Sequence, residues 1–197
     1  AAVPQISPKS NSRETVVAFV GGKTGANDVY TVQIKGLSAQ NFGTHVVATP
    51  RALIDWESVE SHPRWSPRGN QIAFLSDRGL SKGSNYAGLY LMDTDGTGIH
   101  KLEERVVLPL YPDYDTFVWH PSQPYIFFSR QSDQDKDPIC YVNVVTGESE
   151  VINTGTVLNS DLAIHPDGKK LLLCAQGQTD SKDLTWRRLY EATLTGP

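Results

Sequence analysis

Hydrophobic and polar residues alternate with a period of two along much of the chain. In the stretch 29–34 (VYTVQI), the apolar residues Tyr30, Val32 and Ile34 occupy alternate positions. This spacing is typical of a β-strand that buries one face. No segment shows the period of about 3.6 residues that marks an amphipathic helix. The pattern therefore predicts a chain built from β-strands.

A short motif recurs along the chain and divides it into repeats. It consists of an apolar residue, a serine or histidine and a proline, followed by a turn and an apolar run. Three copies contain Pro67, Pro121 and Pro166, and in each copy the apolar run begins five residues after the proline. A fourth copy at 4–8 (PQISP) matches 63–67 (PRWSP) and has a longer turn. Proline removes a backbone donor and fixes φ, so it ends one strand before the turn leads into the next.

Each repeat continues with strand-like segments that are joined by a glycine turn. The third strands are expected at 28–34, 88–93, 138–145 and 188–194, and the outer strands at 44–49, 99–103 and 150–153. The fourth repeat ends inside its turn at Gly196. Four antiparallel strands in about 45–55 residues are typical of a propeller blade. We therefore predict an all-β fold, a β-propeller or partial propeller of about four blades of four antiparallel strands, with the last blade incomplete.

The repeat resembles the WD-like repeat of TolB-type β-propellers. The stretch 63–78 (PRWSPRGNQIAFLSDR), followed by 88–96 (GLYLMDTDG), carries the resemblance, and 165–168 (HPDG) keeps the turn in the fourth repeat. The resemblance implies a binding scaffold or the propeller part of an oligogalacturonate lyase or prolyl-oligopeptidase-like enzyme. It covers nearly the whole chain. We therefore expect one domain over 1–197, with repeats at about 1–53, 54–106, 107–156 and 157–197.

Charge and composition narrow the expected partners. The net charge of −4 argues against nucleic acid, because phosphate binding needs a clustered positive field. No apolar stretch approaches the length of about 18 residues that a membrane span needs. The first residues, AAVPQ, fit a mature terminus after cleavage at small residues as well as a simple cut. We expect a secreted or periplasmic protein.

The two cysteines, Cys140 and Cys174, both lie in apolar strand-like runs. Two cysteines in a chain of 197 residues do not make a disulfide framework. We expect two buried free thiols, and a single bridge between neighbouring strands is the alternative.

The long loops are the expected site of function, because loops on a rigid scaffold carry binding residues. They are expected at 51–62, 76–88, 105–115, 130–138 and 176–187, on one face of the propeller by resemblance to the family. Aromatic residues in these loops fit the binding of a protein or a sugar. The alternative is that they pack between blades. The candidate ligand-binding residues are Trp56, Tyr86, Tyr111, Tyr114 and Trp186.

No metal, cofactor or catalytic residue is predicted. Asp133, Asp135 and Asp137 alternate as in a calcium loop, but Pro138 replaces the required glycine and Val144 the final glutamate, which favours a surface acidic loop. His120 and His165 precede the motif proline, where a side chain more often closes the turn than binds metal. The chain has no G-x-S-x-G, no H-E-x-x-H and no complete phosphate-binding loop.

The sequence therefore favours a non-catalytic scaffold that binds a protein partner through its long-loop face. A carbohydrate-binding propeller (lectin) and the propeller part of a lyase or prolyl-oligopeptidase-like enzyme are the alternatives. The strand at 188–194 is expected to be an uncovered sheet edge, which invites pairing with another strand. We expect a second copy, or another fragment of the same precursor, to cover it. A four-bladed ring that closes on itself is the alternative.

Overall fold

The computed structural model describes residues 4–10, 14–23, 26–35, 48–108, 115, 117–133, 137–177 and 188–194. The described residues form strands, turns and connecting segments, and no helix occurs among them. The prediction of an all-β chain is confirmed.

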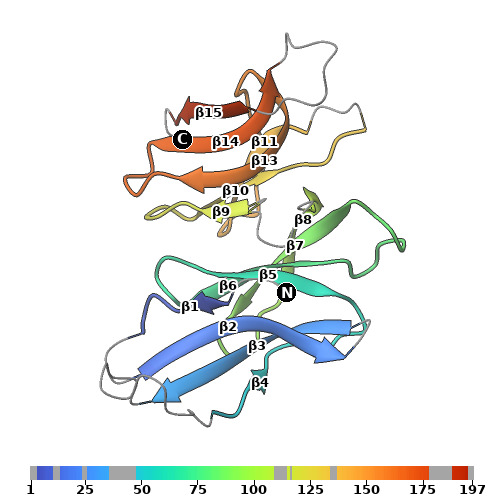
Figure 1. Ribbon diagram of the computed structural model, residues 1–197, viewed down its shortest axis with the longest axis vertical. Helices are drawn as coiled ribbons and strands as arrows, with labels where there is room; N and C mark the ends of the chain where they lie inside the picture. The colour runs from blue at the N-terminus through green and yellow to red at the C-terminus, as the bar shows by residue number, and fades with distance from the viewer. Residues whose placement is uncertain are drawn as a thin grey trace. The chain divides into compact units, whose positions relative to one another are not determined.

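The strands form four antiparallel sheets, each built from one continuous stretch of the chain (Figure 1). Within each sheet, neighbouring strands follow one another in sequence, so every sheet is a simple meander. The first sheet contains β1 (Gln5–Ile6), β2 (Glu14–Lys23), β3 (Ala26–Lys35) and β4 (Arg51–Ala52). The second contains β5 (Glu60–Trp65), β6 (Gln71–Ser76), β7 (Tyr86–Asp93) and β8 (His100–Val107). The third contains β9 (Phe117–Trp119), β10 (Tyr125–Ser129), β11 (Ile139–Asn143) and β12 (Ser149–Ile152), and the fourth contains β13 (Thr156–Ile164), β14 (Lys170–Gly177) and β15 (Arg188–Thr193).

These four sheets of four, four, four and three strands are the predicted blades. The chain divides into two compact units, Ala1–Ser81 with Leu89–Lys101, and Lys82–Gly88 with Leu102–Pro197. Each unit has its own core, made of apolar side chains from two successive sheets. The first core contains Ala18, Val29, Leu53, Ile54, Ile72, Phe74, Tyr90 and Met92, and the second contains Phe127, Ile139, Leu162, Leu171, Leu173 and Ala175.

The repeated motif forms a tight turn between the first and second strands of a blade. In the second blade, the Ser66 N–H donates to the Gln71 carbonyl (2.9 Å), and the Ser66 hydroxyl accepts the N–H groups of Asn70 (3.3 Å) and Gln71 (3.1 Å). Gly69 adopts φ +61°, a conformation that glycine reaches at little cost. The motif therefore encodes a side-chain-capped turn.

The two histidines of the motif occupy the position of Ser66 in their turns. His120 Nδ1 accepts the N–H groups of Ser122 (3.2 Å) and Gln123 (3.0 Å). His165 Nδ1 lies 3.3 Å from the N–H of Asp167. The turn-closing interpretation is confirmed for His120, whereas His165 Nδ1 lies closer to the Asp167 carboxylate, at 2.9 Å from Oδ1, and pairs with that side chain.

Most of the expected outer strand of the first repeat, at 44–49, lies outside the described residues. Of its residues, 48 and 49 are described and are in no strand, and β4 pairs Arg51 and Ala52 with β3. The residues immediately after β4 hold it in this position. Leu53 and Ile54 are buried in the core, and the Leu53 N–H donates to the Val29 carbonyl at 2.9 Å. Burial of these two side chains therefore anchors Arg51 and Ala52 beside β3.

Two loops are shorter than predicted, because β7 already begins at Tyr86 and β8 continues to Val107. The Leu108 N–H donates to the Asn85 carbonyl at 3.1 Å and extends the pairing of these strands. Both cysteines are free thiols, as expected, but only Cys140 is fully buried and Cys174 is half-buried. Burial raises the pKa of the Cys140 thiol to about 11, so this thiol is not a reactive nucleophile at neutral pH.

Candidate functional site

The name long-loop edge is used for the end of each sheet at which the long loops join the strands. It is distinct from the unpaired outer strand of a sheet. In an antiparallel meander, the starts of the first and third strands and the ends of the second and fourth strands all lie at one edge. Each compact unit carries one cluster of arginine and aromatic side chains at the long-loop edge of its own strands.

The Arg78 cluster consists of Trp56, before β5, and Arg78, after β6. The Arg78 guanidinium lies 4.1 Å from the centre of the Trp56 ring. The same ring packs edge-on against Tyr90, with 5.5 Å between ring centres, and lies 6.1 Å from Phe74. Trp56 is therefore partly a core residue, and Arg78 is the exposed member of the cluster.

Glu60 is a buried carboxyl group at the start of β5. Its side chain is 0% exposed, and its Oε1 accepts hydrogen bonds from the hydroxyls of Ser58 (2.7 Å) and Ser76 (2.7 Å). Burial raises the pKa of Glu60, the two serine hydrogen bonds oppose this, and the neighbouring carboxyl of Asp28 raises it further. Asp28 is itself buried and accepts the Trp56 N–H at 3.1 Å. These acidic groups thus hold the segment that carries Trp56.

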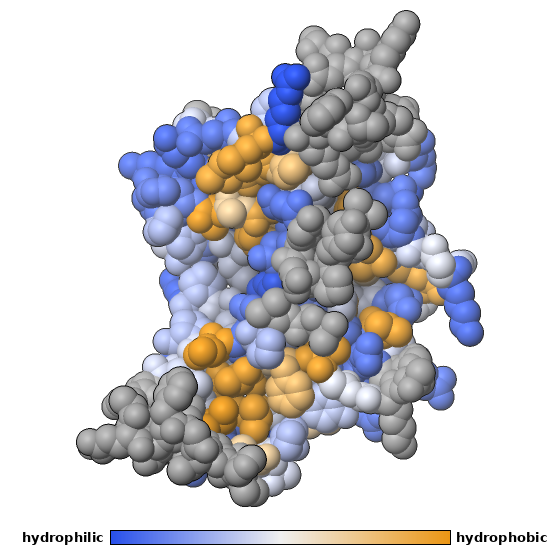
Figure 2. All heavy atoms as spheres, in the orientation of Figure 1, coloured by the Kyte–Doolittle hydropathy of each residue, from blue (hydrophilic) through white to orange (hydrophobic). Residues whose placement is uncertain are grey.

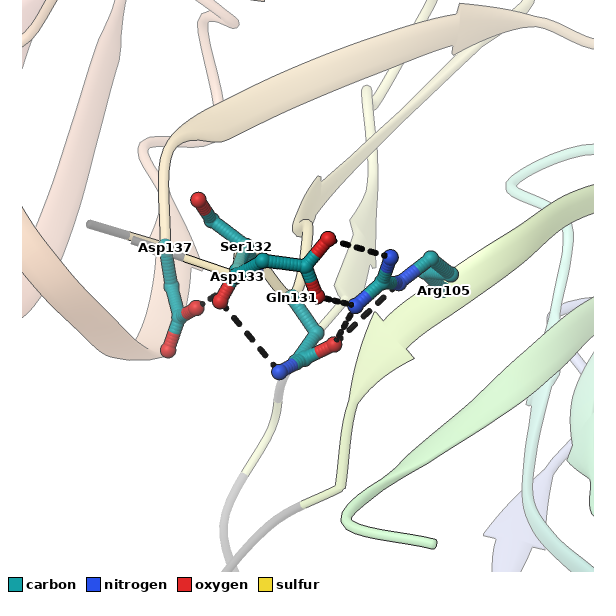
Figure 3. Close-up of polar contacts among 5 residues, drawn as sticks. All are labelled: Arg105, Gln131, Ser132, Asp133 and Asp137. Carbon is teal, nitrogen blue, oxygen red and sulfur yellow. Dashed lines mark hydrogen bonds and ion pairs between the residues drawn. The ribbon is translucent and has the colours of Figure 1, made fainter. Parts of the chain in front are cut away.

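The Arg105 cluster consists of Tyr86, Arg105, Gln131 and Asp133 (Figure 3). The Arg105 guanidinium lies 5.1 Å from the centre of the Tyr86 ring. Its Nη1 donates to Asp133 Oδ2 (3.2 Å) and its Nη2 donates to Asp133 Oδ1 (2.6 Å), a two-pronged ion pair. Its Nε donates to Gln131 Oε1 (3.1 Å), and Nη2 also contacts that oxygen.

The backbone holds the two halves of the Arg105 cluster together. The Gln131 N–H donates to the Arg105 carbonyl at 2.7 Å, next to an antiparallel bridge between Val106 and Arg130. On the far side of the loop, the Ser132 N–H donates to Asp137 Oδ1 at 2.9 Å (Figure 3). The backbone of Gln131 is therefore held beside Arg105 by a main-chain hydrogen bond.

The Arg105–Asp133 pair is ionised at neutral pH. The hydrogen bond from Arg105 and its positive charge lower the pKa of Asp133, and the bond to Asp133 raises the pKa of Arg105. The side chains of Arg105 and Asp133 are 37% and 80% exposed. Solvent therefore screens this pair, and it contributes little to folding.

The structure places two of the five predicted site residues. Trp56 lies in the Arg78 cluster and Tyr86 in the Arg105 cluster, and they lie in different compact units. The other three, Tyr111, Tyr114 and Trp186, lie outside the described residues. Arg78 and Arg105 were not among the residues predicted from the sequence. No signal in the sequence pairs them with Trp56 and Tyr86, because these contacts depend on how the strands lie together.

The described residues show neither a metal centre nor a membrane helix. No group of three or more His, Cys, Asp or Glu side chains among them is placed to hold a metal ion. None of their elements is a helix long and apolar enough to cross a membrane. Apolar side chains gather in patches on the face drawn in Figure 2, with hydrophilic ones around them.

Comparison with known proteins places the fold. No protein-family model matches the sequence, and no curated protein matches it. The structure is similar to TolB from Acinetobacter baumannii (TM-score 0.59, 14% identity), covering 91% of this chain and 39% of that one. It is similar to puromycin hydrolase (TM-score 0.69, 15% identity), covering 98% and 27%. It is also similar to an oligogalacturonate lyase in complex with manganese (TM-score 0.53, 16% identity), covering 98% and 48%.

The chain thus spans between about a quarter and a half of the length of these proteins. At this level of identity the similarity concerns the fold, and proteins of this fold perform different functions. The four meander sheets and these matches together show that the chain has the fold of a TolB-like β-propeller.

Proposed function

We propose that the chain is a non-catalytic scaffold that binds a protein partner through the long-loop edge. The observation that supports this is the same pairing in both units, an arginine laid on an aromatic ring at that edge. Arg78 lies on Trp56, and Arg105 lies on Tyr86. Arginine, tryptophan and tyrosine are the residues most enriched in the energetic centres of protein interfaces.

The two clusters are also pre-organised, which lowers the entropic cost of binding. Trp56 packs against Phe74 and Tyr90. Arg105 donates a hydrogen bond to Gln131, whose backbone is bonded to that of Arg105. A partner that docks on these side chains does not have to order them first.

A carbohydrate-binding propeller is the second candidate, and the aromatic residues favour it less. A sugar ring stacks on an open aromatic face, but the Arg78 guanidinium lies over Trp56 and the Arg105 guanidinium over Tyr86. A sugar would have to displace an arginine from each ring, or use the opposite face. A protein side chain can instead bind the arginine where it lies.

We include in this proposal a second copy of the chain, or another fragment of its precursor, as the partner of β15. Among the described strands, β15 pairs with β14 alone, and Leu189 on β15 is 74% exposed. An outer strand of this kind presents unpaired backbone groups to which another strand can add.

A partner captured from the native source by cross-linking provides the test. We expect Arg78→Ala and Tyr86→Ala each to weaken its binding about tenfold or more, as interface centres do. Val145→Ser is the matched control, because Val145 is 78% exposed in a turn at the opposite edge. Thermal unfolding of each variant verifies that the fold is kept. Equal losses in the Val145→Ser variant, or folded loop-edge variants that bind normally, would contradict the proposal.

A further inference from the structure

We propose that Arg105 recognises a carboxylate on an acidic side chain of the protein partner, and that Asp133 occupies this site in the free chain. The inference rests on the proposed function and deepens it, because it names the chemistry of the partner. In the free chain, the ion pair of Arg105 with Asp133 takes the place of the ion pair that Arg105 forms with the partner.

Groups other than Asp133 orient the Arg105 guanidinium. Gln131 Oε1 accepts the Nε–H of Arg105 at 3.1 Å, and the Tyr86 ring lies 5.1 Å from the guanidinium carbon. Gln131 therefore holds the Nε side of the planar guanidinium, and Tyr86 packs against one of its faces. The remaining N–H groups on Nη1 and Nη2 point to Asp133 as a fork (Figure 3).

These holding groups do not depend on Asp133. The Gln131 N–H donates to the Arg105 carbonyl at 2.7 Å, and this main-chain bond continues the bridge between Val106 and Arg130. Tyr86 belongs to β7. When Asp133 moves away, the fork stays aimed at the same position. A fixed guanidinium fork matches the two oxygens of a carboxylate.

Asp133 is easily displaced. Its side chain is 80% exposed, and an exposed ion pair contributes little free energy. A carboxylate on a docked partner would be shielded from water by the interface, so its bond to Arg105 would be stronger than that of Asp133. The exchange therefore favours the partner while keeping Arg105 neutralised in the free chain.

The test uses a capped peptide with two aspartates, acetyl-Gly-Asp-Gly-Asp-Gly-amide, and its counterpart with asparagine at both positions. Binding is followed by NMR on the backbone N–H signal of Gln131, which lies beside Arg105 and is present in every variant. We expect the aspartate peptide alone to shift this signal. We expect Asp133→Asn to tighten binding about two- to fivefold, because it removes a competitor worth as much as an exposed ion pair. Arg105→Gln should abolish binding, and Arg105→Lys should weaken it because lysine lacks the fork.

The matched control is Glu148→Gln, which removes one negative charge from another exposed position. This control distinguishes an effect of Asp133 on peptide binding from an effect of the net charge of the protein. Equal tightening in Asp133→Asn and Glu148→Gln would overturn the proposal, as would equal binding of both peptides. Free glucuronate supplies a carboxylate on a sugar. Glucuronate binding that depends on Arg105, without peptide binding, would also overturn it.

Failure of this inference can be told from failure of the proposed function. If the peptides do not bind but Tyr86→Ala still weakens the captured partner, the long-loop edge binds protein without reading a carboxylate at Arg105. If neither effect is seen in folded variants, the proposed function itself is wrong.

Discussion

Gly168, in the turn of the fourth blade, lies directly against the imidazole of His120, in the turn of the third. A Cβ added to Gly168 would overlap Cε1 and Nε2 of that ring. A hydrogen bond also joins His120 to the Gly168 backbone. Because Nδ1 of His120 already accepts two backbone N–H groups, Nε2 carries the proton. The His120 side chain thus joins the turns of two successive blades, and it fits there because Gly168 has no side chain.

Gly168→Ala is expected to destabilise the protein more than Gly147→Ala. Both glycines adopt φ +76°, so alanine costs each about 1–2 kcal/mol of backbone strain. No atom lies within 4 Å of a Cβ at Gly147, whereas His120 blocks the one at Gly168. The overlap should add about 1–3 kcal/mol in chemical denaturation. Equal losses would show that the contact between the turns yields without cost.

His120 is expected to make the protein less stable in mild acid. Burial lowers the pKa of His120, and the Gly168 hydrogen bond only partly opposes this. The unfolded chain therefore takes up a proton at a higher pH than the folded chain. The contribution of His120 is complete above its ordinary pKa of about 6.5 and is lost as the pH falls through the lower, folded-state pKa. Thermal midpoints between pH 7.5 and 5 should fall less in His120→Asn than in the native protein.

Glu60 is expected to act in the opposite direction. Burial raises the pKa of Glu60 above 4.5, so the unfolded chain loses this proton first as the pH rises. Stability should therefore decline from about pH 4.5 up through the folded-state pKa and then level off. Glu60→Gln keeps an oxygen for Ser58 and Ser76 but cannot ionise, so its thermal midpoint should lack this decline. The exposed Glu57 provides the control: if Glu57→Gln flattens the profile as much, Glu60 is not its source.

Phe74→Ala is expected to cost about 3–5 kcal/mol of unfolding free energy, because it leaves a large cavity in the first core. Phe74 is fully buried and packs on Trp56 and Tyr90. Leu189→Ala, at a side chain that is 74% exposed, should change stability by less than about 0.5 kcal/mol. Urea denaturation followed by far-UV circular dichroism measures both. A loss of unfolding free energy well below this range for Phe74→Ala would mean that neighbouring side chains move in and fill the cavity.

The fold could be predicted largely because the turn motif repeats. The proline, the capping side chain and the apolar run are local features, and each is visible in a few consecutive residues. β4 and the end of β8 were missed for a different reason. Arg51–Ala52 is too short to show a period, and His100–Val107 carries charged side chains on its exposed positions. Tertiary contacts define these strands.

The candidate site could be predicted only in part. Aromatic residues near long loops led to Trp56 and Tyr86, but their arginine partners could not be identified without the strand pairing. Arg105 and Asp133 are 28 positions apart in the sequence and belong to successive blades. Which loop faces which strand depends on how one blade packs on the next, and no spacing in the sequence encodes that.

The glycines of these turns also limit how closely successive blades can pack. Gly69 lies against Pro8 and Lys9 of the first blade, as Gly168 lies against His120 of the third. In both places, the small residue and the group that it accommodates belong to different blades. A side chain at either glycine would therefore disturb the packing of two blades at once. Each of these turns is a contact between blades as well as a connection within one.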